Sequence, residues 1–277
     1  MTKKTPPPPC TQESEVREWL GGKGFPLEFK VEREFRKYGW STTMGAFAAS
    51  SDEVQREVDV WAWRSSTGQN LNKPATFSAS VIVECKHSKD NAWVLLGRGE
   101  ISTLQIDAYL PFARAVTTDD LLRMSYMAGD DGHARRVVVS HSATSTSSEK
   151  PDGRDVAYGA VDKVVDLAHA TVARFEKRDQ KMRELWLLWP VVLTNGPIWR
   201  TWLNEESGRM ELQQIPFGHL VWSGRGSPTR VDVVSLDGLD EYLSGLGAEV
   251  ESFREWFNRR VRKPAAVQGL GTVGDAD

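Results

Sequence analysis

The chain has 277 residues, 40% of them hydrophobic and 26% charged, which is ordinary for a globular protein of one large domain or two small ones. No run of about eighteen apolar residues predicts a transmembrane helix, and the N-terminus lacks the apolar stretch of a signal peptide. Two cysteines, Cys10 and Cys85, cannot make a disulfide framework or a zinc site. These features favour a cytoplasmic protein without a membrane partner. The formal charge of −3 argues against nucleic-acid binding by net charge alone.

The first part of the chain predicts a tail, a helix and a strand. Residues 1–11 are rich in proline and are expected to be a flexible tail. Apolar residues recur at helical spacing from Glu13 to Leu20, which predicts a short helix. From Leu27 to Tyr38 apolar and charged residues alternate, which predicts a strand. The small and polar residues of Gly39–Val54 indicate a loop.

The most informative stretch of the sequence runs from Arg56 to Ser88. Residues Glu57–Trp63 alternate with a period of two, which predicts a strand. Ser65–Pro74 is rich in Gly, Asn, Ser and Pro and should turn the chain back. A second buried strand is then expected to end at Lys86, so that the two strands can pair as a hairpin.

Charged side chains of this hairpin are expected to meet on one face. Because side chains alternate along a strand, Glu84 and Lys86 point away from the face to which Cys85 belongs. In a hairpin, Asp59 joins them on one side of the sheet. Two carboxylates and an ammonium on rigid strands predict a Mg²⁺ site with a charged lysine beside it. A structural ion pair between Lys86 and Asp59 or Glu84 is the alternative.

The acid-any-lysine spacing of Glu84 and Lys86 also occurs twice elsewhere. At Glu28–Lys30 no strand carrying an acid precedes it, and Asp179–Lys181 lies in a charged run typical of a solvated helix. Only Glu84–Lys86 lies in an apolar run that follows such a strand. Charges in such a run are costly without partners or a metal, which favours the metal site.

These residues resemble the PD-(D/E)xK, or restriction-endonuclease-like, nuclease superfamily. Val58-Asp59 and Glu84-Cys85-Lys86 match its motif, with Val58 where the eponymous proline would stand. The resemblance covers mainly Glu13 to Lys89. It implies an α/β (α+β) fold with a restriction-endonuclease-like core, in which a mixed central sheet is flanked by helices.

The resemblance also implies a role for the first helix, which in many members supplies an acid to the metal centre. Glu15 is the candidate, with Glu18 as the alternative. A glutamate near a helix N-terminus is also favoured by the helix dipole without any metal.

The later elements would complete this core. A helix is expected over Asp155–Phe175 and a buried central strand over Leu185–Leu193. Ser140–Ser148 is expected to be a mobile loop, and its Ser140-His141-Ser142 lacks the strand–turn–helix elbow of a nucleophilic hydrolase. Further strands are expected over Ile198–Leu203, Met210–Ile215, His219–Ser223 and Arg230–Ser235, followed by a helix from Leu239 and another over Val250–Arg262.

The predicted domain organisation is a single nuclease-like domain over residues 12–262, with a disordered tail at 263–277. Within it we expect a core of 12–96 and 152–205, an insertion of 97–151, and a C-terminal β-rich and helical extension of 206–262.

The chemistry expected at the site is metal-assisted hydrolysis. Asp59, Glu84, the backbone carbonyl of Cys85 and Glu15 would hold Mg²⁺, for which Mn²⁺ can substitute. Lys86 would orient or deprotonate the attacking water, or stabilise negative charge. The thiol of Cys85 faces the core and is not expected to be a nucleophile. His87 is expected to face the core as a structural histidine.

The sequence therefore predicts a Mg²⁺-dependent endonuclease that cuts DNA rather than RNA. Its resemblance places it in restriction, phage (antiviral) defence or DNA repair, with a homodimer or partner subunit supplying specificity. The rivals are a catalytically inactive nuclease-fold subunit that binds nucleic acid or assists assembly, and a protein of another kind with similar strands. Some of the eleven tryptophans could stack on bases. Basic clusters at His133–Arg136, Arg174–Arg183 and Arg259–Lys263 either contact nucleic acid or are solvated surfaces.

Overall fold

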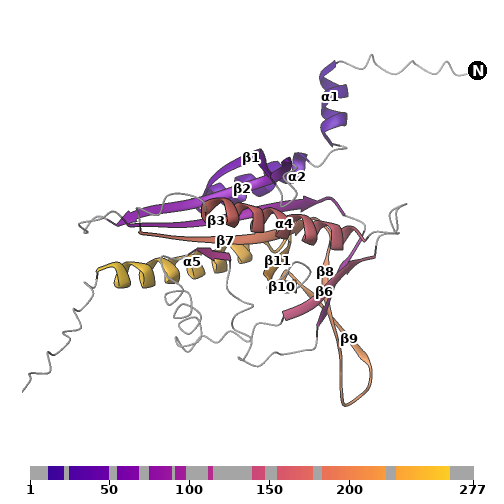
Figure 1. The fold of residues 1–277 in the computed structure, drawn as a ribbon. Coiled ribbons are helices and arrows are strands. Elements are labelled where there is room, and N and C mark those ends of the chain that lie inside the picture. Colours follow the sequence, from indigo (N-terminus) through magenta and orange to yellow (C-terminus); the bar gives the residue numbers. More distant parts are fainter. Residues whose placement is uncertain are drawn as a thin grey trace, which may run out of the picture.

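The computed structural model describes residues 12–21, 25–49, 55–68, 75–88, 91–97, 112–114, 139–146, 155–176, 183–222 and 229–262. These residues form a mixed α/β structure (Figure 1). The helices are α1 (Gln12–Gly21), α2 (Phe25–Lys37), α4 (Val156–Glu176) and α5 (Leu239–Arg262). The strands are β1 (Ser41–Ala49), β2 (Gln55–Gly68), β3 (Ala75–Lys86), β4 (Trp93–Gly97), β5 (Phe112–Arg114), β6 (Val139–Ser145), β7 (Arg183–Thr194), β8 (Ile198–Leu203), β9 (Met210–Ile215), β10 (Phe217–Trp222) and β11 (Thr229–Ser235).

All the described strands belong to one mixed sheet. Neighbouring strands follow the order β1-β2-β3-β7-β11-β10-β6-β4-β8-β9, and β5 pairs separately with β7. Strand β2 is antiparallel to both of its neighbours, β1 and β3, whereas β3, β7 and β11 are parallel. Strand β7 is apolar from Leu185 to Leu193 because this part lies inside the sheet and is covered on both faces.

Each face of the sheet carries its own apolar cluster. Alternate residues of β7 divide between them: Leu187 and Trp189 pack with α2 and α5, whereas Trp186 and Leu188 pack with α4. Helices α4 and α5 accordingly lie on opposite sides of β7 (Figure 1). The sheet is therefore the middle layer, and α4 covers the face to which Glu84 belongs.

The segment Leu27–Tyr38, predicted as a strand, lies in helix α2 (Phe25–Lys37) up to Lys37, so the prediction is wrong. Leu27, Val31 and Phe35 are buried four residues apart, while Phe29, which fitted the alternation, is 57% exposed. A Schellman motif ends the helix: Gly39 N donates to Arg36 O at 2.9 Å and Trp40 N to Phe35 O at 3.1 Å. Gly39 has φ 74°, which glycine adopts without strain.

Other predicted boundaries also change. The predicted loop Gly39–Val54 contains strand β1, and β2 continues to Gly68, into the segment predicted to turn. Most of the predicted mobile loop Ser140–Ser148 belongs to strand β6. The two predicted C-terminal helices are the single helix α5. The elements α1, α4, β7, β8, β9, β10 and β11 confirm the predictions for their segments.

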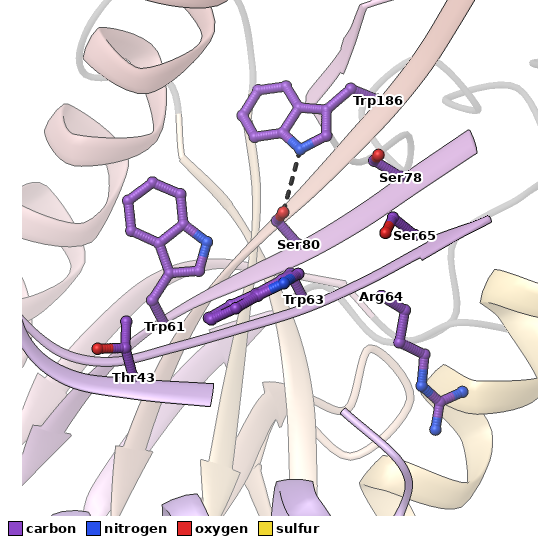
Figure 2. Close-up of a pocket in the computed structure, with 8 residues that line it drawn as sticks. All are labelled: Thr43, Trp61, Trp63, Arg64, Ser65, Ser78, Ser80 and Trp186. Carbon is purple, nitrogen blue, oxygen red and sulfur yellow. Dashed lines mark hydrogen bonds between the residues drawn. The ribbon is translucent and has the colours of Figure 1, made fainter. Parts of the chain in front are cut away.

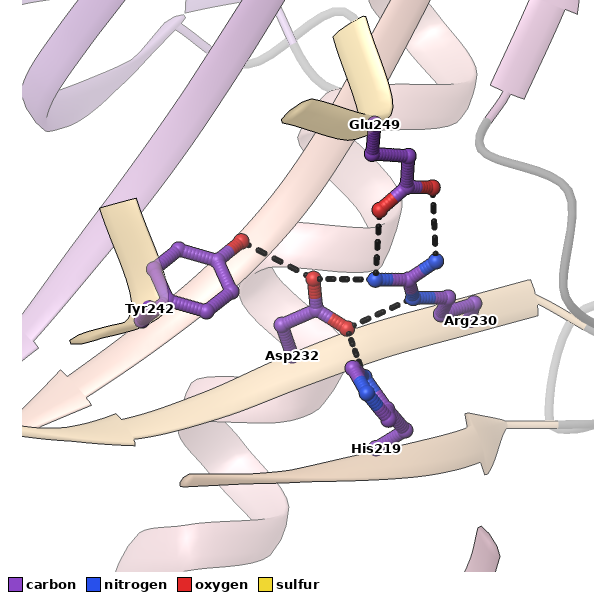
Figure 3. Close-up of polar contacts among 5 residues, drawn as sticks. All are labelled: His219, Arg230, Asp232, Tyr242 and Glu249. Atoms are coloured by element: carbon purple, nitrogen blue, oxygen red, sulfur yellow. Dashed lines mark hydrogen bonds and ion pairs between the residues drawn. The ribbon is translucent and has the colours of Figure 1, made fainter. Parts of the chain in front are cut away.

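A buried polar network ties the C-terminal elements together (Figure 3). The side chain of Asp232 on β11 accepts hydrogen bonds from Arg230 Nε at 2.8 Å and from Tyr242 of α5 at 2.9 Å. His219 Nδ1 of β10 lies 2.7 Å from the same carboxylate. Arg230 also contacts Glu249 of α5 at 3.0 Å. Burial alone would raise the pKa of Asp232, but Arg230 and His219 hold it well below its usual value.

Several predictions lie outside the described residues. They include both tails, the basic cluster His133–Arg136, and the side chain of His141. In the described ranges no helix is long and apolar enough to cross a membrane.

Candidate active site

Asp59 lies where the pairing of β2 with β3 begins. Val60 pairs with Val83 and Trp61 with Ile82, and this register continued by one residue sets Asp59 opposite Glu84. Opposite residues of an antiparallel pair share a face of the sheet. The backbone N–H of Cys85 donates to Asp59 Oδ2 at 2.7 Å, which fixes the carboxylate against β3.

Strand β2 is irregular at Asp59. Val58 and Val60 are both fully buried, yet Val58 packs with the α4 cluster and Val60 with the α2 and α5 cluster. On the neighbouring strand, Gly45 lies between the paired residues Met44 and Ala46 and has φ 60°. Glycine permits this conformation, so the local change in side-chain direction at Asp59 depends in part on Gly45.

Glu84 lies between two ammonium groups. Its side chain is 2% exposed, and Lys86 Nζ lies 2.5 Å from Glu84 Oε1. Lys163 Nζ of α4 contacts the other carboxylate oxygen, Oε2. A buried carboxylate requires such partners because desolvation disfavours its charge. The structure thus brings Asp59, Glu84 and Lys86 together, as the hairpin predicted.

Lys163 connects both carboxylates. Its ammonium lies 3.7 Å from Asp59 Oδ1 as well as against Glu84. Burial lowers the pKa of Lys163, but the attraction of Glu84 and Asp59 outweighs burial and holds the pKa above its usual value. Conversely, burial, followed by repulsion from Glu84, raises the pKa of Asp59.

Sequence analysis did not single out Lys163. Its one local signal is that Lys163 and Asp166 interrupt, at a spacing of three, a helix face otherwise made of apolar residues. Asp166 is also buried and lies 3.7 Å from Arg56 Nε of β2. Two polar residues of α4 therefore reach toward β2, which only the tertiary structure reveals.

The acid that helix α2 brings to the site is Glu28. Burial, followed by repulsion from Asp59, Glu57 and Glu84, raises its pKa from 4.5 to about 7. Glu15, predicted for this role, is exposed on α1, a helix that packs against α2 and stands away from the sheet (Figure 1). Glu18 is likewise exposed on α1. The largest electrostatic effects on Glu28 come from other residues, Asp59, Glu57 and Glu84 among them.

The end of β3 is held by hydrogen bonds that follow Lys86 directly. Ser88 N donates to Asn195 Oδ1 at 2.7 Å, and Ser88 Oγ lies 2.7 Å from Thr194 Oγ1. Gly196 is required here because a Cβ would come within 2.3 Å of the Ser88 carbonyl oxygen. His87 is exposed beside Asn195, so the prediction that it faces the core is wrong.

Cys85 points to the opposite face from Glu84 and Lys86, as alternation predicted. It packs against the α2 and α5 cluster, and burial raises the pKa of its thiol well above the usual value. The thiol is therefore neutral at physiological pH and is unsuited to nucleophilic attack.

The donor set suits a hard cation in part. Carboxylate oxygens of Asp59 and Glu84 converge, and burial, followed by repulsion from Asp59, Glu57 and Glu84, raises the pKa of Glu28. Within the described residues, however, no three His, Cys, Asp or Glu side chains form a ready-made metal cluster. Lys163 contacts both carboxylates where a cation would be attracted.

No family model matches the chain, and no curated protein or solved structure is significantly similar to it.

Proposed function

We propose that the protein is a Mg²⁺-dependent nuclease that hydrolyses phosphodiester bonds of DNA. The observation that carries the proposal is the convergence of the Asp59 and Glu84 carboxylates with the Lys86 ammonium on one face of the sheet. Carboxylate oxygens suit Mg²⁺, and an adjacent ammonium suits a negatively charged substrate.

The order of elements supports the resemblance to the PD-(D/E)xK superfamily. Helix α2 is followed by three antiparallel strands, and α4 precedes β7, which lies parallel to β3. This is the helix–three strands–helix–strand order expected of the core, with α2 rather than α1 as its first helix. In the proposal Glu28 takes the place expected for Glu15.

Asp59, Glu84 and the carbonyl of Cys85 would hold Mg²⁺, and Mn²⁺ can substitute for it. The bound ion would lower the pKa of a water molecule and neutralise charge on the phosphate. Lys86, whose side chain is 29% exposed, combines contact with Glu84 and access to solvent. It can therefore donate hydrogen bonds to a phosphate oxygen or orient the attacking water. Glu84 keeps Lys86 at this position.

A catalytically silent nuclease-fold subunit is the second candidate. One observation favours it: the Lys163 ammonium contacts both carboxylates and already compensates their charge. A protein of this kind would bind nucleic acid or assist assembly without cutting, and would not need Mg²⁺.

Cleavage of supercoiled plasmid DNA and of RNA in the presence of Mg²⁺ tests the proposal. We expect DNA cleavage by the wild type and a loss of at least about 100-fold in Asp59→Asn and Glu84→Gln. Asp237→Asn is the matched control, because it makes the same change on an exposed turn and should leave cleavage intact.

Equal cleavage by the wild type and both site variants would contradict the assignment of the site. DNA binding without cleavage in every variant would favour the silent subunit. If the protein cleaves RNA but not DNA, the assignment of the site stands and the substrate is RNA instead of DNA.

A further inference from the structure

A pocket of about 350 Å³ lies on the sheet face that carries the candidate site (Figure 2). Trp61 and Trp63 of β2 and Trp186 of β7 line it, together with hydroxyl groups of β1 and β3. Trp61 and Trp63 follow Asp59 by two and four residues, so they lie about 7 and 13 Å farther along the strand. We call it the tryptophan pocket.

The two sites share the strands that build them. Ser80 and Ser78 precede Glu84 by four and six residues on β3, and therefore point to the same face. The register pairs Trp63 with Ser80 and Ser65 with Ser78, which places aromatic and hydroxyl groups next to one another across the strands. The pocket and the carboxylate site thus lie next to each other along β2 and β3, with Lys163 of α4 covering Glu84 at the far end.

The lining is aromatic and hydroxylic rather than charged. Arg64 borders the pocket, but its side chain points to the other side of the strands (Figure 2), where its guanidinium lies 4.7 Å from the Trp40 ring centre. Among the described lining residues no charged side chain points inward. The pocket therefore suits a flat, neutral ring with polar edges better than a phosphate or a charged group.

Its walls are held in place before any ligand binds. The buried Trp186 donates from Nε1 to Ser80 Oγ at 3.0 Å. Ser80 accepts this hydrogen bond and so retains its own hydroxyl hydrogen to donate. Trp63 is 38% exposed, which leaves part of its indole available for stacking. Fixed aromatic faces bind at low entropic cost because little is left to order.

We propose that the tryptophan pocket binds a base of a single-stranded nucleic acid whose backbone continues to Asp59 and Glu84. This deepens the proposed function and rests on it for the identity of the strand. Bases of single strands stack on aromatic side chains irrespective of sequence. A base within a duplex would first have to leave its stack. The substrate would then be single-stranded, or would carry an unpaired base beside the scissile phosphate.

Fluorescence anisotropy with the full chain tests this proposal. Oligothymidylate and a duplex of equal length are titrated in EDTA, so that no cleavage occurs. We expect tighter binding of the single strand and at least about a fivefold loss of its affinity in Trp63→Ala. Trp63→Phe should restore most of the affinity because it keeps an aromatic face. Trp19→Ala is the matched control: Trp19 is 56% exposed on α1, and its removal should change nothing.

An abasic oligonucleotide gives a test that needs no variant. The wild type should bind it as weakly as Trp63→Ala binds oligothymidylate, and the variant should lose little more when the bases are removed. Unchanged affinity in Trp63→Ala, equal affinity for the duplex, or equal affinity for the abasic strand would overturn the proposal. So would binding of a neutral oligosaccharide in place of the single strand.

These experiments distinguish a failure of the base-binding proposal from a failure of the nuclease proposal. Base-dependent binding through Trp63 without Mg²⁺-dependent cleavage would support base binding by the tryptophan pocket and contradict the proposed nuclease activity. If cleavage depends on Asp59 but the affinity for the single strand does not change in Trp63→Ala, the proposed base binding is wrong and the proposed nuclease activity stands.

Discussion

At the scale of single residues, the site is a balance of charges around Glu84. This nearly buried carboxylate contacts the ammonium groups of Lys86 and Lys163, and Asp59 shares the second of them. Glu28 adds a further acid, whose pKa is raised first by burial and then by repulsion from Asp59, Glu57 and Glu84. Because these carboxylates repel one another, we expect the site to attract a divalent cation.

Lys163 should compete with such a cation. We expect Lys163→Gln to raise the affinity for Mg²⁺ by about tenfold, because removing a positive charge a few ångströms away strengthens the attraction for another. Isothermal titration calorimetry measures the change. Lys37→Gln, on the exposed end of α2, is the control and should bind Mg²⁺ as the wild type does. Unchanged or weaker binding in Lys163→Gln would contradict the competition.

Glu28 should make stability depend on pH. Because its pKa is raised from 4.5 to about 7 in the folded state, its contribution to stability is full below about pH 4.5 and is lost as pH rises to about 7. Glu28→Gln should therefore unfold with a flatter pH profile across this window and be more stable at pH 8. After discounting for solvent screening we expect a gain of about 1 kcal/mol.

Chemical denaturation at a series of pH values measures this effect. Glu13→Gln, on α1 and paired with the exposed Arg17, is a matched control that should follow the wild type. A parallel profile for Glu28→Gln and the wild type would show that Glu28 lies in an ordinary environment.

At the scale of elements, the hairpin was predictable and helix α2 was not. Alternation identified β2, β3 and the faces of Glu84 and Cys85, because both strands have strongly apolar inner positions. In α2, however, the buried residues Leu27, Val31 and Phe35 fit a period of two as well as a helical one. The deciding signals were Pro26 in the first turn and Gly39 after the last, which mark a helix start and end.

Because α2 was predicted to be a strand, the acid expected from the first helix was also assigned to the wrong residue. With α2 taken as a strand, α1 became the first helix of the core, and Glu15 became the candidate. Once α2 is a helix, the acid-any-lysine match at Glu28 is part of its first turn, and Glu28 reaches the site from there.

Gly45 should be sensitive to substitution because of its backbone. We expect Gly45→Val to destabilise the protein by about 1 to 3 kcal/mol, since a β-branched residue is strained at φ 60°. The new side chain would also crowd Glu57, whose Oε1 would lie 3.3 Å from the Cβ. Because Gly45 lies beside Asp59, activity should fall even where the variant remains folded.

Thermal unfolding together with the cleavage assay tests this expectation. Gly159→Ala is the control: a Cβ there meets no atom within 4 Å, and the helical position should gain about 0.4 to 1 kcal/mol. Gly45→Val with wild-type stability would show that β1 does not need a glycine at this point.

At the scale of the whole molecule, the sheet order could not be inferred from local patterns. Strand β11 lies beside β7, and β4 and β6 join the same sheet from distant parts of the chain. The contacts of Lys163 with the site, and the electrostatic effect of the site on Glu28, depend on how α4 and α2 pack on opposite faces, for which a single sequence carries little local signal. The local sequence pattern was enough to predict the site residues of the hairpin, whereas Lys163 and Glu28 come near them through the packing of α4 and α2.

The Asp232 network should be important for the stability of the C-terminal half. We expect Asp232→Asn to cost about 3 to 5 kcal/mol, because it removes a negative charge that lies directly against the buried Arg230 guanidinium. Tyr242→Phe removes only one hydrogen bond and should cost about 1 kcal/mol. Urea denaturation gives both values. Equal, small losses in the two variants would show that the network is not a coupled unit.

The central claim is that Asp59 and Glu84 form a divalent-cation site in which Lys86 acts on the substrate rather than on the ion. Calorimetric titration of Mg²⁺ into the wild type, Asp59→Asn and Lys86→Ala tests it most directly. We predict binding by the wild type, binding at least as tight by Lys86→Ala, and a loss of at least about tenfold in Asp59→Asn. Equal binding by all three proteins, or no binding by the wild type, would contradict the claim.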